Sequence, residues 1–482
     1  MGLSSALSNA LAGMNVNQRG IDVVSRNVAN QGTPGYHRQS LVLQETSFGA
    51  SAGVRPASVS RAFDSALEKQ HLVSVSSVGF YGVKASYLDR MQIELGRPGD
   101  PQSLDTLYSK FENALQAMAT NPNDLGARAG VINAAQTLVE QLNLLTNQVQ
   151  EMRRDVEYQM SNSVSELNTA LKSLENINTQ LKGQVQDPTA RLAMLDERDR
   201  LVASISEKME ISVNYRDNGT VSLMTPNGVG LLDYTASQFS FVPTGAVSAN
   251  DPDVVGQLML RTPSGLEVDL VGQGLLTSGS LAGLAELRDK TLVDMQHQLD
   301  DIASALALAM NTAADPADDD LALDLFIDGA NPYDENDIQG FAGRIRLNPD
   351  VIADPTLLVQ YGPDISLGDQ ARPQFLLNNL KTMNFVSDHV SDIDNGGVRL
   401  SGRVGDLVSQ MINHQGSIVA NAQSKSSSAM YSLESVTMRM EEQYGVNIDE
   451  EMARLLQLQT AYSANARVIS TVQELMNALL RM

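Results

Sequence analysis

The sequence predicts a mainly α-helical, multidomain protein with a small β domain inserted between its helices. Three observations lead to this prediction. Apolar residues recur at alternating steps of three and four at both ends of the chain, the spacing of a coiled-coil seam. The same spacing continues through a very long stretch in the first half. Between about 209 and 281 the apolar period falls to two, which is typical of strands.

The first seam lies at the N-terminus. Its members are Leu3, Leu7, Ala10, Met14, Asn17, Ile21, Val24 and Val28. Gly13 and Gly20 interrupt this stretch, and each costs a helix about 1 kcal/mol. We therefore expect a helix that is marginal by itself in water.

The C-terminal stretch repeats the pattern. Its seam consists of Leu455, Leu458, Tyr462, Asn465, Ile469, Val472, Met476 and Leu479. Each seam contains one central asparagine, Asn17 or Asn465, a residue that fixes coiled-coil register at some cost in stability. The two seams indicate that the chain ends pair with each other. Two independent amphipathic helices docked on a core are the alternative.

Further helices are predicted between the two ends. Helical patterns cover 61–95, 103–119, about 126–182, about 281–314, about 371–390 and about 400–443. The stretch over 126–182 would span roughly 80 Å at 1.5 Å per residue. Its seam changes step near Met160 and Val164, which makes this a candidate break point. Rods of this length are typical of elongated or assembly proteins.

The β insert is predicted from alternation and from turn residues. Ile211, Val213 and Tyr215 alternate with polar residues, and Asn218-Gly219 follows, a strong hairpin signal. We expect a small antiparallel β domain over 206–281. A short acidic and mostly irregular segment is expected over 315–371, because its first part, 315–337, has nine acidic residues and no basic one.

Composition excludes several function classes. The chain has 34 Lys and Arg against 57 Asp and Glu, a formal charge of −23, which argues against nucleic acid and anionic membranes as partners. It has no cysteine, so disulfides, thiol nucleophiles and cysteine metal sites are excluded. No apolar stretch is long enough for a membrane span, and the first residues lack the pattern of a cleaved signal peptide. We expect a cytoplasmic protein, or one exported without such a signal.

No catalytic, cofactor or metal site is expected. The five histidines, His37, His71, His297, His389 and His414, lack metal-site spacing and are more typical of surface or packing positions. The acidic runs that begin at Asp315 and Asp392 lack the full ligand pattern of a calcium loop. Residues 196–200 are interpreted as an ion-pair cluster on a helix. We therefore expect a protein that is not an enzyme and needs no cofactor.

A distinctive turn follows the first helix. Ala29 and Asn30 precede Gly32, which suits the positive-φ position beyond a helix end, and the run Thr33, Pro34, Gly35, Tyr36 fits a type II turn. This segment resembles the signature of the bacterial flagellar axial proteins, the rod, hook and hook-associated proteins. The runs 195–201 and 445–471 are similar to its hook–filament junction members. The resemblance covers most of the chain, and 315–371 departs from it.

The resemblance implies a domain plan. Residues 1–45 and 430–482 would form a terminal coiled-coil domain, and 55–205 with 282–430 a long-helix domain that carries the β insert. It also implies a function: a structural, non-enzymatic subunit of the junction layer between hook and filament, assembled by coupled folding of its terminal helices. The protein would reach the extracellular flagellum by type III export without a cleaved signal peptide.

The resemblance implies partners as well. These are sister copies in a tubular layer, the hook protein, the second hook–filament junction protein, and an export chaperone that binds the C-terminal seam; neither nucleic acid nor membrane insertion is implied. Three alternatives stay open: a hook or distal rod protein of the same family, a secreted hydrolase with coiled-coil ends, and a generic helical adaptor.

Overall fold

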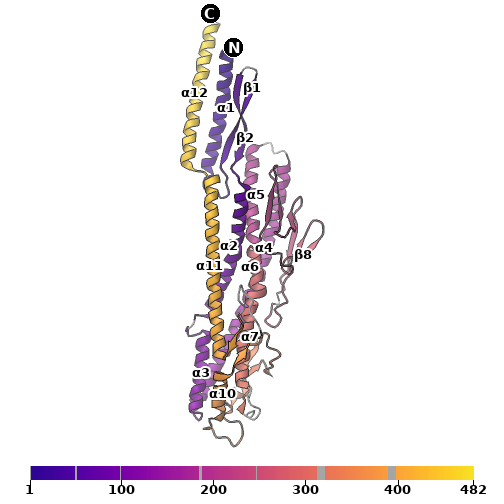
Figure 1. The fold of residues 1–482 in the computed structure, drawn as a ribbon, viewed down its shortest axis with the longest axis vertical. Helices are drawn as coiled ribbons and strands as arrows, with labels where there is room; N and C mark the ends of the chain where they lie inside the picture. The colour runs from indigo at the N-terminus through magenta and orange to yellow at the C-terminus, as the bar shows by residue number, and fades with distance from the viewer. Residues whose placement is uncertain are drawn as a thin grey trace.

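The computed structural model describes residues 2–48, 51–97, 99–183, 187–245, 247–311, 321–388 and 398–481. It is an elongated stack of helices, and the two chain ends lie side by side at one end of it (Figure 1). The predicted fold class, mainly α with small antiparallel sheets, is confirmed. No helix among the described ranges is both long and apolar enough to cross a membrane.

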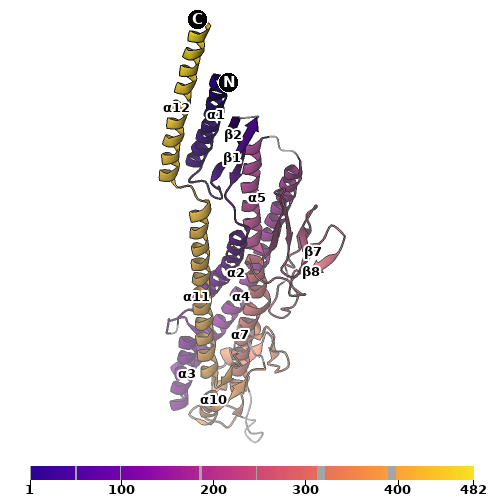
Figure 2. The same cartoon turned by 45° about the horizontal axis from the view of Figure 1, so that its top comes forward.

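The terminal part contains two helices and a hairpin. Its elements are α1 (Gly2–Ala29), β1 (Gln39–Phe48), β2 (Ser51–Arg61) and α12 (Ile448–Leu480). Strands β1 and β2 pair antiparallel, with an irregularity between Val42 and Leu43. α1 packs against α12 and against both strands (Figure 2). The hairpin was not predicted, and the expected domain limits at 45 and 55 fall inside its strands.

The body is built from long helices. They are α2 (Ser65–Leu95), α3 (Leu104–Thr120), α4 (Leu125–Lys182), α5 (Pro188–Lys208), α6 (Ser280–Glu286), α7 (Leu292–Asn311), α10 (Ala371–Thr382) and α11 (Val404–Tyr444). Asp124 caps α4 by accepting a hydrogen bond from the Gly126 backbone N–H. α4 runs unbroken over 58 residues, and the step change at Met160 and Val164 does not interrupt it because both side chains stay buried.

Three helix limits differ from the prediction. The helix expected over 281–314 contains a π-helical turn, η1 (Leu287–Thr291), between α6 and α7. α10 ends at Thr382 rather than 390, because β12 (Phe385–Val386) then pairs with β13 (Ser401–Gly402). α11 continues through residue 430, where a domain limit was expected, and the chain breaks only at 445–447.

The β insert forms two three-stranded antiparallel sheets. Their strands are β3 (Ser212–Tyr215), β4 (Val221–Met224) and β5 (Gly230–Leu232), then β6 (Gln238–Phe241), β7 (Leu258–Arg261) and β8 (Glu267–Asp269). The predicted turn at Asn218-Gly219 is present, with φ of 87° at Gly219, and a second Asn-Gly turn has φ of 85° at Gly228. Asn178 of α4 holds the first sheet: its amide donates to the Val221 carbonyl and accepts from the Val221 N–H.

The acidic segment is more structured than expected. Its described part contains β9 (Phe326–Asp328), β10 (Asn331–Pro332), α8 (Phe341–Arg344), β11 (Ile345–Leu347), α9 (Pro349–Ala353) and the 3-10 turn η3 (Pro355–Leu358). The carboxylate of Asp300 in α7 accepts hydrogen bonds from the backbone N–H groups of Gly340 and Ala342, each over 2.9 Å. A buried side chain of the helix therefore anchors the segment.

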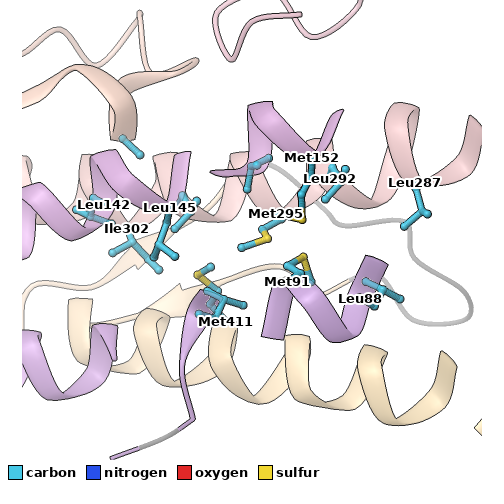
Figure 3. Packing of buried hydrophobic residues seen from close by; sticks show 14 of the residues in the cluster. Leu88, Met91, Leu142, Leu145, Met152, Leu287, Leu292, Met295, Ile302 and Met411 are labelled. Atoms are coloured by element: carbon cyan, nitrogen blue, oxygen red, sulfur yellow. The ribbon is translucent and has the colours of Figure 1, made fainter. Parts of the chain in front are cut away.

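The core between the long helices is aliphatic and rich in methionine. Met91, Met152, Met295 and Met411 lie among leucines from α2, α4, α7 and α11 (Figure 3). The chain contains no tryptophan, so flexible methionines fill the irregular space between helices.

Candidate assembly surface at the paired chain ends

Helices α1 and α12 pack antiparallel, with close approaches at Gly13 and Gly20 of α1. A Cβ atom on Gly13 would lie 2.8 Å from Nδ2 of Asn465, and one on Gly20 would lie 3.0 Å from a methyl group of Leu458. The two glycines therefore admit the partner helix at close range. The half-buried or buried seam residues of α1 are Leu3, Leu7, Ala10, Met14, Asn17, Ile21, Val24 and Val28. Those of α12 are Leu455, Leu458, Tyr462, Asn465, Ile469 and Val472.

The end of α12 extends past the start of α1 (Figure 1). Extending the register of the Gly13–Asn465 contact brings Met476 level with Gly2, where α1 begins. Met476 and Leu479, the last two predicted seam positions, are 43% and 59% exposed. Met476 lies at the end of the helix pair, and Leu479 lies beyond it. We call the exposed apolar residues at this end the α12 tip: Leu475, Met476, Leu479 and Leu480.

α1 has a second buried stripe that the seam analysis missed. Val16, Gly20, Val23 and Asn27 recur at steps of four, three and four, and all are buried. Gly20 of this stripe contacts Leu458 of α12, and Asn27 bonds both to Glu451 of α12 and to Gln39 of β1, so the stripe lies between α12 and the β1–β2 hairpin. Among the described residues, α12 packs extensively against α1 alone, and its buried residues are Glu451 and Val472. The outer faces of α12 are therefore uncovered.

The turn after α1 has the predicted geometry at one glycine and not at the other. The Tyr36 N–H donates to the Thr33 carbonyl over 3.2 Å, and Gly35 has φ of 74°, as a type II turn requires. The expectation of a positive φ at Gly32 is wrong. The helix ends instead through Asn30, whose backbone N–H and side-chain amide both donate to the Arg26 carbonyl.

Asn27 connects the two chain ends. Its Nδ2 donates to the Gln39 carbonyl over 2.9 Å and to Oε2 of Glu451 over 3.0 Å. Its Oδ1 accepts from the Tyr36 hydroxyl over 2.9 Å and from the Gln39 N–H over 3.0 Å. Burial raises the pKa of Tyr36 to about 12, so this hydroxyl keeps its proton. One buried amide thus joins α1, the turn, β1 and α12.

A buried ionic cluster ties the terminal part to the body. Nδ1 of His37 lies 3.0 Å from Oδ1 of Asp196 on α5. The Arg61 guanidinium donates to the same carboxylate over 2.8 Å and to Asp199 over 2.5 Å. The predicted ion-pair cluster in 196–200 therefore reaches across to the end of β2. His37 is 5% exposed and contributes to this cluster through its Nδ1.

The break between α11 and α12 is fixed by Tyr444. Its hydroxyl accepts from the Asp64 N–H over 2.8 Å and donates to the Asp64 carbonyl over 3.0 Å. Burial raises the pKa of Tyr444 to about 12, which preserves this donor. The Tyr444 carbonyl accepts from the Arg38 N–H over 2.8 Å. The start of α12 is therefore held beside the start of α2 and the segment before β1.

A groove of about 550 Å³ lies at this joint, and we call it the joint groove. It is lined by residues 31–37 of the turn, by His71, and by Thr437, Met440, Glu441, Tyr444, Gly445 and Val446. The axial-family turn motif thus forms one wall of a groove, and the end of α11 forms the other.

Comparison with known protein families gives two matches. Residues 90–319 match the family model described as the helical domain of flagellar hook-associated protein FlgK. Residues 439–482 match the C-terminal region of the flagellar basal body rod proteins FlgEFG. Both matches are to flagellar proteins, and the longer one is to the helical domain of the hook-associated protein FlgK.

Two named relatives match along nearly their full length. The chain is 24% identical to flagellar hook-associated protein 1 of Bacillus subtilis, over 98% of this chain and 97% of that protein. It is 24% identical to flagellar hook-associated protein 1 of Salmonella typhimurium, over 99% of this chain and the whole of that protein. The solved structure of the hook junction protein FlgK from Burkholderia pseudomallei matches with a TM-score of 0.43 and 24% identity, over 56% of this chain and 45% of that one.

The described ranges contain no candidate metal cluster. Within them, no group of three or more His, Asp or Glu residues is placed to hold an ion. The candidate calcium loop at 392–397 and His389 lie outside the described residues, as does the start of the acidic run at 315–320.

Sequence reasoning missed several residues of this surface. Asn27, Glu451 and Tyr444 lie within or beside the runs that carry the family resemblance, but their roles depend on partners hundreds of positions away. The second stripe of α1 was detectable, because Val16, Val23 and Asn27 repeat with a helical period. Asn27 is the only polar side chain in that stripe, a signal of a buried hydrogen-bonding role.

Proposed function

We propose that this protein is a structural subunit of the bacterial flagellum that forms the junction layer between hook and filament. The observation that carries the proposal is the antiparallel pairing of α1 with α12, joined at its base by the Asn27–Glu451 hydrogen bond. Relatives matched along nearly their full length are named hook-associated protein 1, and none of those names describes an enzyme. The role is therefore one of assembly, without catalysis.

The proposed mechanism is folding coupled to assembly. In a lone subunit, α12 rests on one helix and leaves its outer faces in water, while Gly13 and Gly20 lower the helix propensity of α1 by about 1 kcal/mol each. Neighbouring subunits in a tubular layer would cover these faces and offset the entropy of ordering both helices.

Circular dichroism tests the coupled folding. A chain lacking 2–29 and 448–480 should show more helix per residue than the full-length monomer, because the deleted helices are only partly formed before assembly. Equal or lower helix per residue would contradict the mechanism.

The proposed partners follow from the position of this junction layer between hook and filament. The hook protein would lie on one side of it and the second hook–filament junction protein on the other. Before assembly, an export chaperone would cover the seam of α12, from Leu455 to Val472, together with the tip. Export would use the flagellar type III apparatus without cleavage of a signal peptide.

Fluorescent labelling on intact cells tests the location. We expect a single narrow band at the base of each filament, and loss of filaments but not of hooks when the gene is deleted. A signal confined to the cell interior would refute the proposal.

A hook or distal rod subunit is the second candidate, because residues 439–482 match the rod protein C-terminal family. Labelling along the whole length of the hook or rod, in place of one band, would favour it.

A further inference from the structure

We infer that Asn227 is a site of spontaneous deamidation, at which the backbone nitrogen of Gly228 attacks the Asn227 side chain and converts it to an acidic residue. The site lies in the β insert, between β4 and β5. This insert packs on the helices of the body, away from the paired chain ends (Figure 1). The inference therefore goes beyond the proposed assembly role and does not depend on it.

The reaction needs an asparagine, a flexible following residue and water. The Gly228 nitrogen bonds to Cγ of Asn227 and gives up its proton, the carboxamide nitrogen leaves as ammonia, and a cyclic succinimide results. Water then opens the ring at either carbonyl, which gives aspartate or isoaspartate. Glycine favours the first step because it has no Cβ to crowd the attacking nitrogen. Neither an oxidant nor a reductant takes part.

Two turns of the insert share one backbone geometry and provide an internal comparison. The backbone N–H of each turn glycine donates to the carbonyl three positions earlier, over 2.8 Å at Gly219 and 2.9 Å at Gly228. The φ angles are 87° and 85°. Both Asn218 and Asn227 are exposed to water. Backbone geometry therefore does not distinguish the two asparagines, and the surroundings of their side chains decide which one reacts.

The Asn218 side chain is held in place. Its Oδ1 accepts hydrogen bonds from the Thr220 backbone N–H over 3.0 Å and from the Thr220 hydroxyl over 2.8 Å. Its neighbour is crowded, since a Cβ on Gly219 would lie 2.9 Å from a methyl group of Leu195. The carboxamide must turn toward the glycine nitrogen to react, and the bonds to Thr220 would then break.

The Asn227 side chain has no such restraint. Among the described residues, its carboxamide forms no hydrogen bond. The residue two positions further on is Val229, which has no hydroxyl and whose backbone N–H donates to Oγ1 of Thr225 over 3.1 Å instead. Beyond its chain neighbours, no atom lies within 4 Å of a Cβ at Gly228. The carboxamide can therefore turn toward the Gly228 nitrogen in open solvent.

Asn227 should deamidate about ten-fold faster than Asn218, because the hydrogen bonds to Thr220 must be broken before Asn218 can react. Each event adds one negative charge to an exposed turn. Isoaspartate also lengthens the backbone between β4 and β5. The acidic form therefore accumulates with the age of each copy.

Peptide mass spectrometry tests the site on the full-length protein. The protein would be aged in mildly alkaline buffer made with water enriched in the heavy oxygen isotope, with fragment spectra locating each event. Heavy oxygen should enter at Asn227 about ten-fold faster than at Asn218. Equal rates, or a faster reaction at Asn218, would overturn the inference. A third such asparagine, Asn395, lies outside the described residues and would be scored separately.

A reciprocal pair of variants tests the cause. Val229→Thr gives Asn227 the hydroxyl that holds Asn218 and should slow the reaction at Asn227. Thr220→Val removes that hydroxyl and should speed the reaction at Asn218. Both variants should fold, because the two side chains have nearly the same shape and the other turn already carries the incoming residue at the equivalent position. An unchanged rate in either variant would refute the proposed cause and the inference with it.

Discussion

Asn27 and Glu451 are 424 positions apart in the chain, and Nδ2 of Asn27 donates to Oε2 of Glu451 over 3.0 Å. Both side chains are buried, with 1% and 3% exposure. This bond joins the first helix to the last at the point where both meet the body. It makes the pairing of the chain ends depend on one amide whose four hydrogen bonds are all formed within the protein.

Replacing that amide should loosen the chain ends. Asn27→Ala removes four hydrogen bonds and leaves the Glu451 carboxylate buried without its donor, which should cost about 3 kcal/mol. In isolated flagella, where the helix pair is complete, hydrogen exchange of α12 amides should become faster while that of α4 stays unchanged. Glu450→Ala is the matched control, since Glu450 is exposed and forms a surface ion pair with Arg38 at 3.5 Å. Equal protection of α12 in Asn27→Ala and the native chain would refute the role of Asn27.

A charge in the seam should prevent assembly without unfolding the body. Ile469→Asp places a carboxylate against α1, where it would be half-buried without a partner, so the helix pair should open. We expect loss of filaments in cells and an unchanged main thermal transition by circular dichroism. Leu456→Asp, at a 59% exposed position of the same helix, should leave the pair intact. Collapse of the whole thermal transition in Ile469→Asp would contradict this separation.

Two glycines of the turn motif should respond differently to the same change. Gly35 has φ of 74°, and a Cβ there would lie 2.8 Å from Cγ of Arg200. Gly35→Val should therefore destabilise the joint by about 2 kcal/mol and reduce motility. Gly32→Val is the control, because no atom lies within 4 Å of a Cβ at Gly32 and its φ is not positive. Equal motility of the two variants would show that the turn tolerates strain.

The anchor of the acidic segment should make stability depend on pH. Burial raises the pKa of Asp300 from 3.8 to about 7. The folded state therefore holds this proton more tightly than the unfolded state, so its contribution is greatest below pH 4 and is lost between about pH 4 and pH 7. The difference corresponds to on the order of 4 kcal/mol.

Asp300→Asn should flatten this dependence. Urea unfolding at several pH values would compare the free energy of unfolding of the variant and the native chain. Asp350→Asn, at an exposed carboxylate in the same segment, should leave the slope unchanged. A native stability that rises steadily from pH 4 to pH 7 in the same way with and without Asp300 would refute the assignment.

The region where the chain ends meet the body shows how much of the structure could be predicted from the sequence. The seams, the type II turn at Gly35 and the Asn-Gly turns were predictable, because period and turn chemistry are properties of neighbouring residues. The β1–β2 hairpin was missed because its packing on the second stripe of α1 is long-range. The π-helical turn was missed for a similar reason. Buried Arg288 donates to Glu157 over 3.3 Å and to the Gly256 carbonyl over 2.7 Å, and these long-range contacts cannot be predicted from a local sequence pattern.

By itself, the sequence determined that the chain is mainly helical, that both ends carry helical seams, and that a β insert interrupts the helices. Those properties depend on spacings of a few residues, which set which face of each element is apolar. Only the tertiary structure decided where the antiparallel register stops, leaving the α12 tip without a partner, and which buried polar groups meet at the joint. These depend on contacts between residues hundreds of positions apart, whose energies arise only once the helices have packed.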